Sequence, residues 1–170
     1  MQKDSTPDLN QLAVVAAECA ALNVRKASRT ITRLYAAAFE ETGLEPTQFT
    51  LLVACCRTPR ITMSSLAERL SMDRSALARN VSILERRGLL EVEPGRDRRE
   101  RRVSATAAGQ DKLCEALPHW RAVQRTLAET FGRKTFMSMI STLQAMTRTG
   151  QALLQDQALL QDTDRENVAS

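Results

Sequence analysis

The sequence has 170 residues, 43% of them hydrophobic but only 4% aromatic, with a net charge of +4 and a pI of about 9.2. This length suffices for one compact domain, and the scarcity of aromatic residues favours a helix-rich fold over a β-sandwich. The polar N-terminus shows no signal-peptide pattern and no run of about 18 apolar residues occurs, which argues against secretion and membrane insertion. We expect a cytoplasmic protein that contacts no membrane.

The first predicted element is a long helix over residues 9–41. This segment contains neither Gly nor Pro, and its apolar residues recur at helical spacing, with Asn23 as an interruption. Gly43 ends the helix, because glycine readily adopts the left-handed conformation that closes a helix. Pro46 suits the first turn of a second helix, and Thr62 is the expected N-cap of a short third helix.

A fourth helix, over residues 74–87, has two chemically different faces. Leu77, Val81 and Leu84 follow one another at spacings of four and three, which predicts a buried face. The residues of the opposite face are polar or basic: Ser75, Arg79, Ser82 and Arg86. Such a helix packs on its own core with one side and offers hydrogen-bond donors and positive charge with the other.

A basic β-hairpin follows Gly88. We expect its strands at Leu89–Val92 and Arg101–Ser104, joined by an arginine-rich turn. Residues 74–102 contain nine arginines, no lysine and five acidic residues, so this segment alone holds the net charge of the whole protein. The order of helix, glycine, strand, basic turn and strand predicts a winged helix-turn-helix.

Helical segments flank this unit on both sides. After Thr106 the helical pattern resumes, with Pro118 as an expected kink, and continues towards the C-terminus. The expected fold is therefore mainly α, with a small β-hairpin wing, in one compact domain. Residues 46–106 form its winged helix-turn-helix, and residues 9–44 and 107–162 form a helical region.

The two-faced helix and the basic turn point to double-stranded DNA. A helix fits the major groove, where Arg79 is the expected bidentate contact to guanine and Ala76 meets a thymine methyl group. Arg86, late in the helix, is expected to contact phosphate. An arginine-rich turn suits the narrow minor groove, where the negative potential is enhanced. The candidate DNA-binding residues are Arg74, Ser75, Ala76, Arg79, Ser82, Arg86, Arg96, Asp97, Arg98, Arg99 and Arg101.

Other functions fit the sequence less well. An isolated arginine-rich turn is often only a solvated loop, but here it follows a two-faced helix by one short strand. A winged-helix module that binds protein predicts an acidic or apolar outward face, which this helix lacks. The chain has one histidine, no CxxC spacing, no glycine-rich phosphate loop and no GxSxG motif. We therefore expect no enzyme, no metal and no cofactor.

Four segments resemble the MarR family of transcriptional regulators. They are TRLY (Thr32–Tyr35), GLEPTQFTLL (Gly43–Leu52), MSSLAERLSMDRSALARNVSILERRGLLE (Met63–Glu91) and DRRERRVSATAAG (Asp97–Gly109). The resemblance covers about residues 12–150. It implies a homodimer joined by its first and last helices, a near-palindromic operator, and repression relieved by a small molecule or an oxidant. On the family pattern, Asp97 is the acid of the wing, and Arg99 enters the minor groove.

The resemblance also implies a crevice for a small ligand, such as an aromatic acid, between the dimerisation and DNA-binding parts. By position, the candidate effector-binding residues are Asn23, Arg25, Phe49, His119 and Trp120. Each has an ordinary structural alternative. Asn23 suits a hydrogen-bonded core amide, Arg25 an exposed helix charge and His119 a structural role.

A thiol-based redox sensor is the alternative regulatory mechanism. Sensors of organic hydroperoxides within this family use a cysteine near the start of the first helix, which makes Cys19 the candidate. Those sensors activate the thiol with tyrosine hydroxyls, whereas this sequence has only Tyr35, with Phe39 and Phe49 where a hydroxyl would be useful. A reactive thiol needs thiolate stabilisation, so this departure favours an inert Cys19. In a reducing cytosol we expect four free cysteines, most of them buried and inert.

Overall fold

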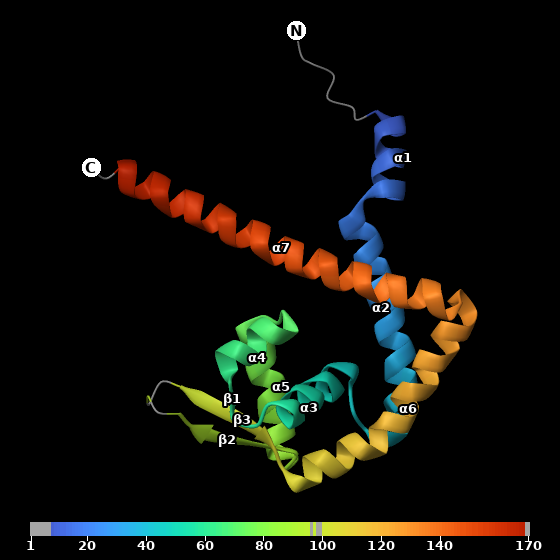
Figure 1. The fold of residues 1–170 in the computed structure, drawn as a ribbon, viewed down its shortest axis with the longest axis vertical. Helices are drawn as coiled ribbons and strands as arrows, with labels where there is room; N and C mark the ends of the chain where they lie inside the picture. Colours follow the sequence, from blue (N-terminus) through green and yellow to red (C-terminus); the bar gives the residue numbers. More distant parts are fainter. Residues whose placement is uncertain (1–7, 96, 98–99, 169–170) are drawn as a thin grey trace. The chain divides into compact units, whose positions relative to one another are not determined.

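The computed structural model describes residues 8–95, 97 and 100–168, with side chains described as far as Asp156. The expected helix-rich fold with a small antiparallel sheet is confirmed (Figure 1). The chain divides into two compact units, Met1–Val123 and Gln124–Ser170. Within the described ranges, every helix is too short or too polar to cross a bilayer.

The N-terminal segment contains two helices and a short 3-10 turn where the sequence predicted one helix. They are α1 (Leu9–Glu18), α2 (Ala20–Phe39) and η1 (Glu40–Thr42). The break falls at Cys19, whose ψ of 110° is extended. The side-chain amide of Asn23 donates to the carbonyl oxygens of Ala17 (3.0 Å) and Cys19 (3.1 Å). This amide bonds to carbonyl groups at the break, where the regular helical pattern is interrupted.

The winged helix-turn-helix follows in the expected order. Its elements are α3 (Pro46–Arg57), β1 (Ile61–Thr62), α4 (Met63–Leu70), α5 (Arg74–Arg86), β2 (Leu90–Pro94) and β3 (Arg101–Ala105). Pro46 is the first residue of α3, as predicted. The hydroxyl of Thr62 accepts from the N–H of Ser65 at 3.1 Å, which confirms Thr62 as the N-cap of α4.

The sheet has three antiparallel strands in the order β1-β3-β2, one more than the sequence predicted. β1 has only two residues, too few to show the alternation by which a strand is identified. Val103 lies in the central strand between Ile61 and Val92 and is fully buried. β2 extends to Pro94, two residues beyond the prediction, where proline is tolerated at the end of the hairpin.

One hydrophobic core joins the sheet to helices α3, α4 and α5. Its largest fully buried side chains are Phe39, Leu51, Leu52, Cys55, Leu66, Leu77, Leu84 and Val103. Phe39, the last residue of α2, stacks on Phe49 with ring centroids 4.8 Å apart. The end of α2 is therefore anchored in the core of the winged helix-turn-helix.

Two long helices complete the chain. They are α6 (Ala107–Phe131), which contains Pro118, and α7 (Arg133–Val168). Gly132, with φ of 79°, separates them. In α6, Ala116 is buried, and Leu113, Leu117 and Trp120 are partly buried against the same core.

The junction between the wing and α6 explains the Thr-x-x-Gly motif at residues 106–109. The hydroxyl of Thr106 donates to the carbonyl of Gly88 (2.7 Å) and accepts from the N–H of Gly109 (3.0 Å). A Cβ atom at Gly109 would lie only 2.0 Å from the carbonyl oxygen of Leu89. This close approach of two backbones requires glycine.

Gly109→Ala is therefore expected to lower the free energy of unfolding by about 2–3 kcal/mol, because the clash is with backbone that cannot move without shifting the sheet. Chemical denaturation measures the change. Gly150→Ala is the matched control, since Gly150 also lies in a helix but has no neighbour within 4 Å of the added methyl group. That change is expected to be neutral or to stabilise by about 0.5–1 kcal/mol. Equal destabilisation by both substitutions would contradict the packing explanation.

Candidate nucleic-acid interface

Helix α5 presents the two faces that its sequence predicted. Leu77, Val81 and Leu84 are at most 4% exposed and belong to the core. The candidate contact residues on the other side are exposed: Arg74, Ser75, Arg79, Ser82 and Arg86. Ala76 is half-buried beside them. Packing thus fixes the rotation of α5 about its axis and leaves a continuous polar and basic face accessible.

Asp73 caps the start of α5, a role that the sequence analysis did not assign. Its Oδ1 accepts from the N–H groups of Ser75 (2.8 Å) and Ala76 (3.2 Å) and from the hydroxyl of Ser75 (2.5 Å). The hydrogen bond from the Ser75 hydroxyl, with smaller contributions from these backbone groups, lowers the pKa of Asp73 below its usual value. The sequence contained a signal for this role, because an aspartate immediately before an amphipathic helix is a typical N-cap.

The cap makes the stability of the protein depend on pH. Because the pKa of Asp73 is lowered in the folded state, its contribution is present above the unfolded pKa and is lost as the pH falls through the folded pKa. We expect Asp73→Ala to lower the melting temperature at neutral pH by about 2–4 °C. Asp73→Asn is the control, since asparagine caps a helix without titrating. Melting temperatures are measured at pH 7 and pH 3. A fall in melting temperature between these pH values that is as large for Asp73→Asn as for the wild type would contradict a titrating cap at Asp73.

The described part of the wing carries both free and paired cations. Arg101 is exposed at the start of β3, whereas Arg102 forms an ion pair with Glu100 at 2.6 Å. Asp97 is exposed at the turn. Arg60, which precedes β1, pairs with Glu93 on β2. The predicted contacts Arg96, Arg98 and Arg99 lie outside the described residues.

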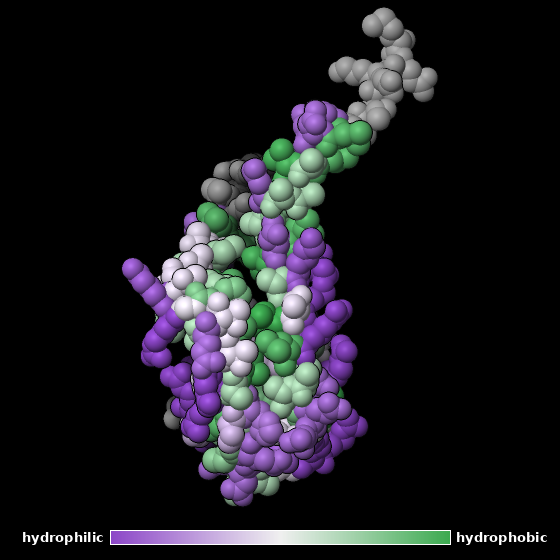
Figure 2. Space-filling view, turned by 90° about the vertical axis from the view of Figure 1, so that its right-hand side faces the viewer, coloured by the Kyte–Doolittle hydropathy of each residue, from purple (hydrophilic) through white to green (hydrophobic). Residues whose placement is uncertain are grey.

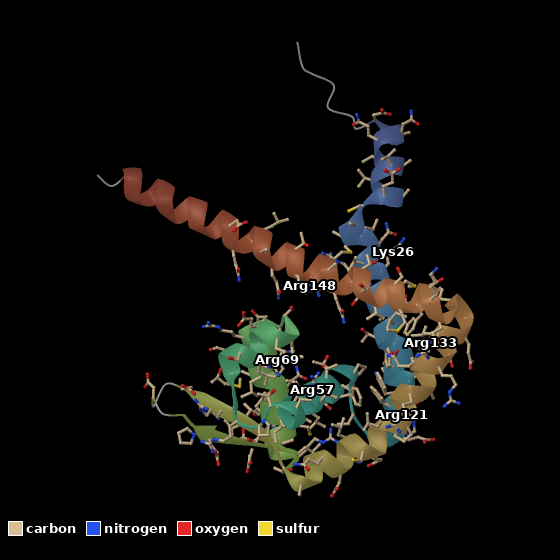
Figure 3. The ribbon with its side chains drawn as sticks, in the orientation of Figure 1. Lys26, Arg57, Arg69, Arg121, Arg133 and Arg148 are labelled. Carbon is tan, nitrogen blue, oxygen red and sulfur yellow. The ribbon has the colours of Figure 1, made fainter. Side chains whose placement is uncertain are left out.

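A cavity of about 430 Å³ opens between helices α3, α4 and α6. Its lining residues are Phe49, Thr50, Val53, Ala54, Arg57, Arg69, Leu70, Leu117 and Trp120. Most of them are apolar, and the two arginines are solvent-exposed. Figure 3 labels Arg57 on α3 and Arg69 on α4. A cavity that combines aromatic and aliphatic walls with a few polar groups is the usual form of a small-molecule site.

Two of the five predicted effector-binding residues, Phe49 and Trp120, line this cavity. The other three are elsewhere: Asn23 bonds to the backbone at the α1–α2 break, Arg25 is exposed on α2, and His119 on α6 is not a lining residue.

The sequence analysis missed the two cations of the cavity. Phe49, Val53 and Arg57 follow one another at intervals of four, a helical spacing that could have identified Arg57. Neither Arg57 nor Arg69 forms an ion pair within the part of the chain that the structure describes. Nη1 of Arg69 donates to the hydroxyl of Thr58 at 2.6 Å. Each arginine also lies in the last turn of its helix, where a positive charge is favourable.

All four cysteines are free, but only Cys55 is buried and Cys114 is exposed, so the expectation that most of them are buried is wrong. Burial, and secondarily the neighbouring Cys56, raises the pKa of Cys55 to about 12. Burial, with a smaller effect of Cys114, also raises the pKa of Cys56. A raised pKa disfavours the reactive thiolate. Cys19 is half-buried at the α1–α2 break, and its redox role stays a prediction.

Comparisons with known proteins give consistent results. A sequence model described as the MarR family matches residues 42–100. The M. tuberculosis transcriptional regulator MosR, solved in complex with DNA, is 34% identical over 75% of this chain and 98% of its own, with a TM-score of 0.63. None of the curated proteins matches the sequence.

Two structures of CouR share the fold at lower identity. The transcriptional repressor CouR bound to a 23-mer DNA duplex is 21% identical over 84% of this chain and 99% of its own, with a TM-score of 0.72. CouR from Rhodococcus jostii RHA1 bound to p-coumaroyl-CoA is also 21% identical, over 74% of this chain and 89% of its own, with a TM-score of 0.66.

Proposed function

This chain belongs to the MarR family of transcriptional regulators, and from that premise we propose that it is a homodimeric repressor of a near-palindromic operator, released by a small anionic ligand. The observation that carries the DNA-binding part is the division of α5 into a buried apolar face and an exposed face of serines and arginines. Arg79 reads a guanine in the major groove, and Arg86 contacts phosphate.

Footprinting on the DNA that flanks the gene for this protein tests the proposal. A dimer with one recognition helix in each of two successive major grooves protects half-sites about 34 Å apart on one side of the duplex. Random DNA of the same length is the control. Equal affinity for every flanking and random fragment would contradict a sequence-specific regulator.

Exposed apolar residues on the terminal helices support the homodimer. On α1 and α2 they are Leu9, Leu12, Val14, Val15, Val24, Ile31 and Leu34, and on one face of α7 they are Met139, Leu143, Met146, Leu153 and Leu154. Figure 2 shows hydrophobic surface along the N-terminal end of the described chain. Exposed apolar side chains in this number are typical of a protein interface, and a second copy of the same helices covers them in the proposed dimer.

The cavity between α3, α4 and α6 supports an anionic effector. Its apolar walls suit an aromatic or aliphatic body, and the cations Arg57 and Arg69 suit a carboxylate. Arg69 links α4, the first helix of the helix-turn-helix, to Thr58 at the end of α3. A carboxylate that recruits Arg69 breaks this link, and α4 then moves relative to α3. The ligand p-coumaroyl-CoA of CouR, a relative in fold, is likewise an aromatic body joined to anionic groups.

Trp120 makes this part of the proposal measurable, because it is the only tryptophan of the chain and it lines the cavity. Benzoate is expected to change its fluorescence and release the operator, whereas benzyl alcohol, a neutral molecule of similar shape, is expected to do neither. Arg57→Gln and Arg69→Gln should each weaken benzoate binding about tenfold or more, since each removes a charge-assisted hydrogen bond. Arg57→Gln should retain operator binding without ligand, whereas Arg69→Gln, which also removes the hydrogen bond to Thr58, should weaken it. Unchanged benzoate affinity in both variants would show that neither arginine contacts the ligand.

A further inference from the structure

Arg87, the residue after the recognition helix α5, makes two long-range contacts within the protein. Arg87 is the C-cap of α5. Its Nη1 donates to the carbonyl oxygen of Gly43 at 3.0 Å and to Oε1 of Gln48 at 3.3 Å. These acceptors precede Arg87 by 44 and 39 residues. The side chain of its neighbour Arg86 is exposed and forms no hydrogen bond or ion pair among the described residues.

Both acceptors of Arg87 are themselves fixed in place. Gly43 closes η1 in the left-handed conformation, with φ of 64°. Gln48 is only 6% exposed, and its Oε1 also accepts from the N–H of Glu45 at 3.2 Å. The buried hydroxyl of Thr42 donates to the carbonyl of Phe39 at 2.7 Å. Arg87 thus binds to a corner, residues 39–48, in which each acceptor is constrained by local bonds.

The corner connects α5 to α2. Phe39, at the end of α2, is anchored by stacking on Phe49, and the corner leads directly into α3. Farther along α2, Ile31 and Leu34 expose apolar side chains that belong to the proposed dimer surface. The hydrogen bonds of Arg87 therefore join the C-terminal end of the recognition helix to the base of a helix of that surface.

We infer that Arg87 is a positioning residue that sets the separation of the two recognition helices, and thereby the half-site spacing that the operator must have. The inference rests on the proposed function, since it requires a dimer on a two-part operator. With Arg87 in place, α5 keeps one orientation relative to α2. Without it, the end of α5 has more freedom, and the dimer tolerates operators whose half-sites are displaced. Arg87 acts here through Gly43 and Gln48 and not through a phosphate.

The test compares operators whose half-sites have the native spacing with operators lengthened or shortened by one base pair. One base pair displaces and rotates a half-site, because the duplex turns once in about 10–10.5 base pairs. The wild type should strongly prefer the native spacing. Arg87→Met should reduce this preference about tenfold, which is the scale of one charge-assisted hydrogen bond. Arg86→Met, the matched control, should weaken binding to all three operators in the same proportion and leave the preference intact.

Gln48→Met separates positioning from a phosphate contact, because it removes an acceptor and leaves the charge of Arg87 free to reach DNA. It should relax the spacing preference by less than Arg87→Met does, because the hydrogen bond to Gly43 remains, and the double variant should behave like Arg87→Met alone. Arg87→Lys, which keeps the charge, should restore the preference only in part. If Arg87→Met folds poorly, Gln48→Met and Arg87→Lys still test the positioning role of Arg87. Melting curves of each variant show whether it is folded.

Three results would overturn the inference. They are equal weakening on all spacings by Arg87→Met, an unchanged preference in Gln48→Met, and full restoration by Arg87→Lys. Failure of the proposed function has a different signature. A wild-type protein that sediments as a monomer, or shows no spacing preference at all, contradicts the dimeric repressor itself. A dimeric wild type with a strict preference that survives both substitutions contradicts only the role of Arg87.

Discussion

Leu143→Asp is expected to abolish the dimer and to weaken operator binding by roughly 10²- to 10⁴-fold. In a dimer the second half-site is bound intramolecularly, and a monomer loses this gain in affinity. On α7, Met139, Leu143, Met146 and Leu153 are exposed at spacings of four, three and seven residues. These spacings place them on one helical face. An aspartate in the middle of that face buries a charge without a partner whenever two copies associate. Sedimentation velocity and operator titration measure the two effects.

Ser141→Asp is the matched control on the same helix. Ser141 precedes Leu143 by two residues and therefore lies on nearly the opposite side of α7, where it is also exposed. The control introduces the same charge on the same helix and is expected to leave the dimer intact. A wild type that is monomeric at micromolar concentration, or a Leu143→Asp variant that remains a dimer, would contradict the proposed interface.

Arg79→Ala is expected to lower the binding free energy for the cognate operator by about 1–3 kcal/mol while barely affecting random DNA. Arg79 lies in the middle of the exposed face of α5, about one and a half turns after the capped end of the helix. A bidentate contact to guanine discriminates between sequences, so its loss reduces specificity more than general affinity. Titrations on cognate and random duplexes at the same salt concentration measure both terms.

Arg86→Ala separates the two kinds of contact. A phosphate contact is present on every sequence, so this variant should weaken cognate and random binding alike and reduce the slope of log affinity against log salt by about one per subunit. Both residues are exposed arginines on one helix, so loss of charge is common to the two variants. Proportional losses on both duplexes for Arg79→Ala would mean that Arg79 contacts phosphate as well.

Local patterns in the sequence determined the helix-turn-helix and its exposed face. Leu77, Val81 and Leu84 occupy the core, and Thr62 caps its helix, as their spacing and chemistry predicted. These features depend on residues within one or two helical turns of each other, so a linear pattern contains them. The same locality explains the successful prediction of α3, which begins at Pro46.

Contacts between distant residues were decided only by the tertiary structure. The strand β1 exists because Ile61 pairs with Val103, and a two-residue strand has no pattern of its own. The cavity forms where α3, α4 and α6 meet, so Arg57 and Arg69 become neighbours of Trp120 only after folding. Arg87 and Arg86 are identical side chains in adjacent positions, yet only Arg87 reaches Gly43. The sequence determines which face of a helix is apolar or charged, whereas the packing of helices determines what that face meets.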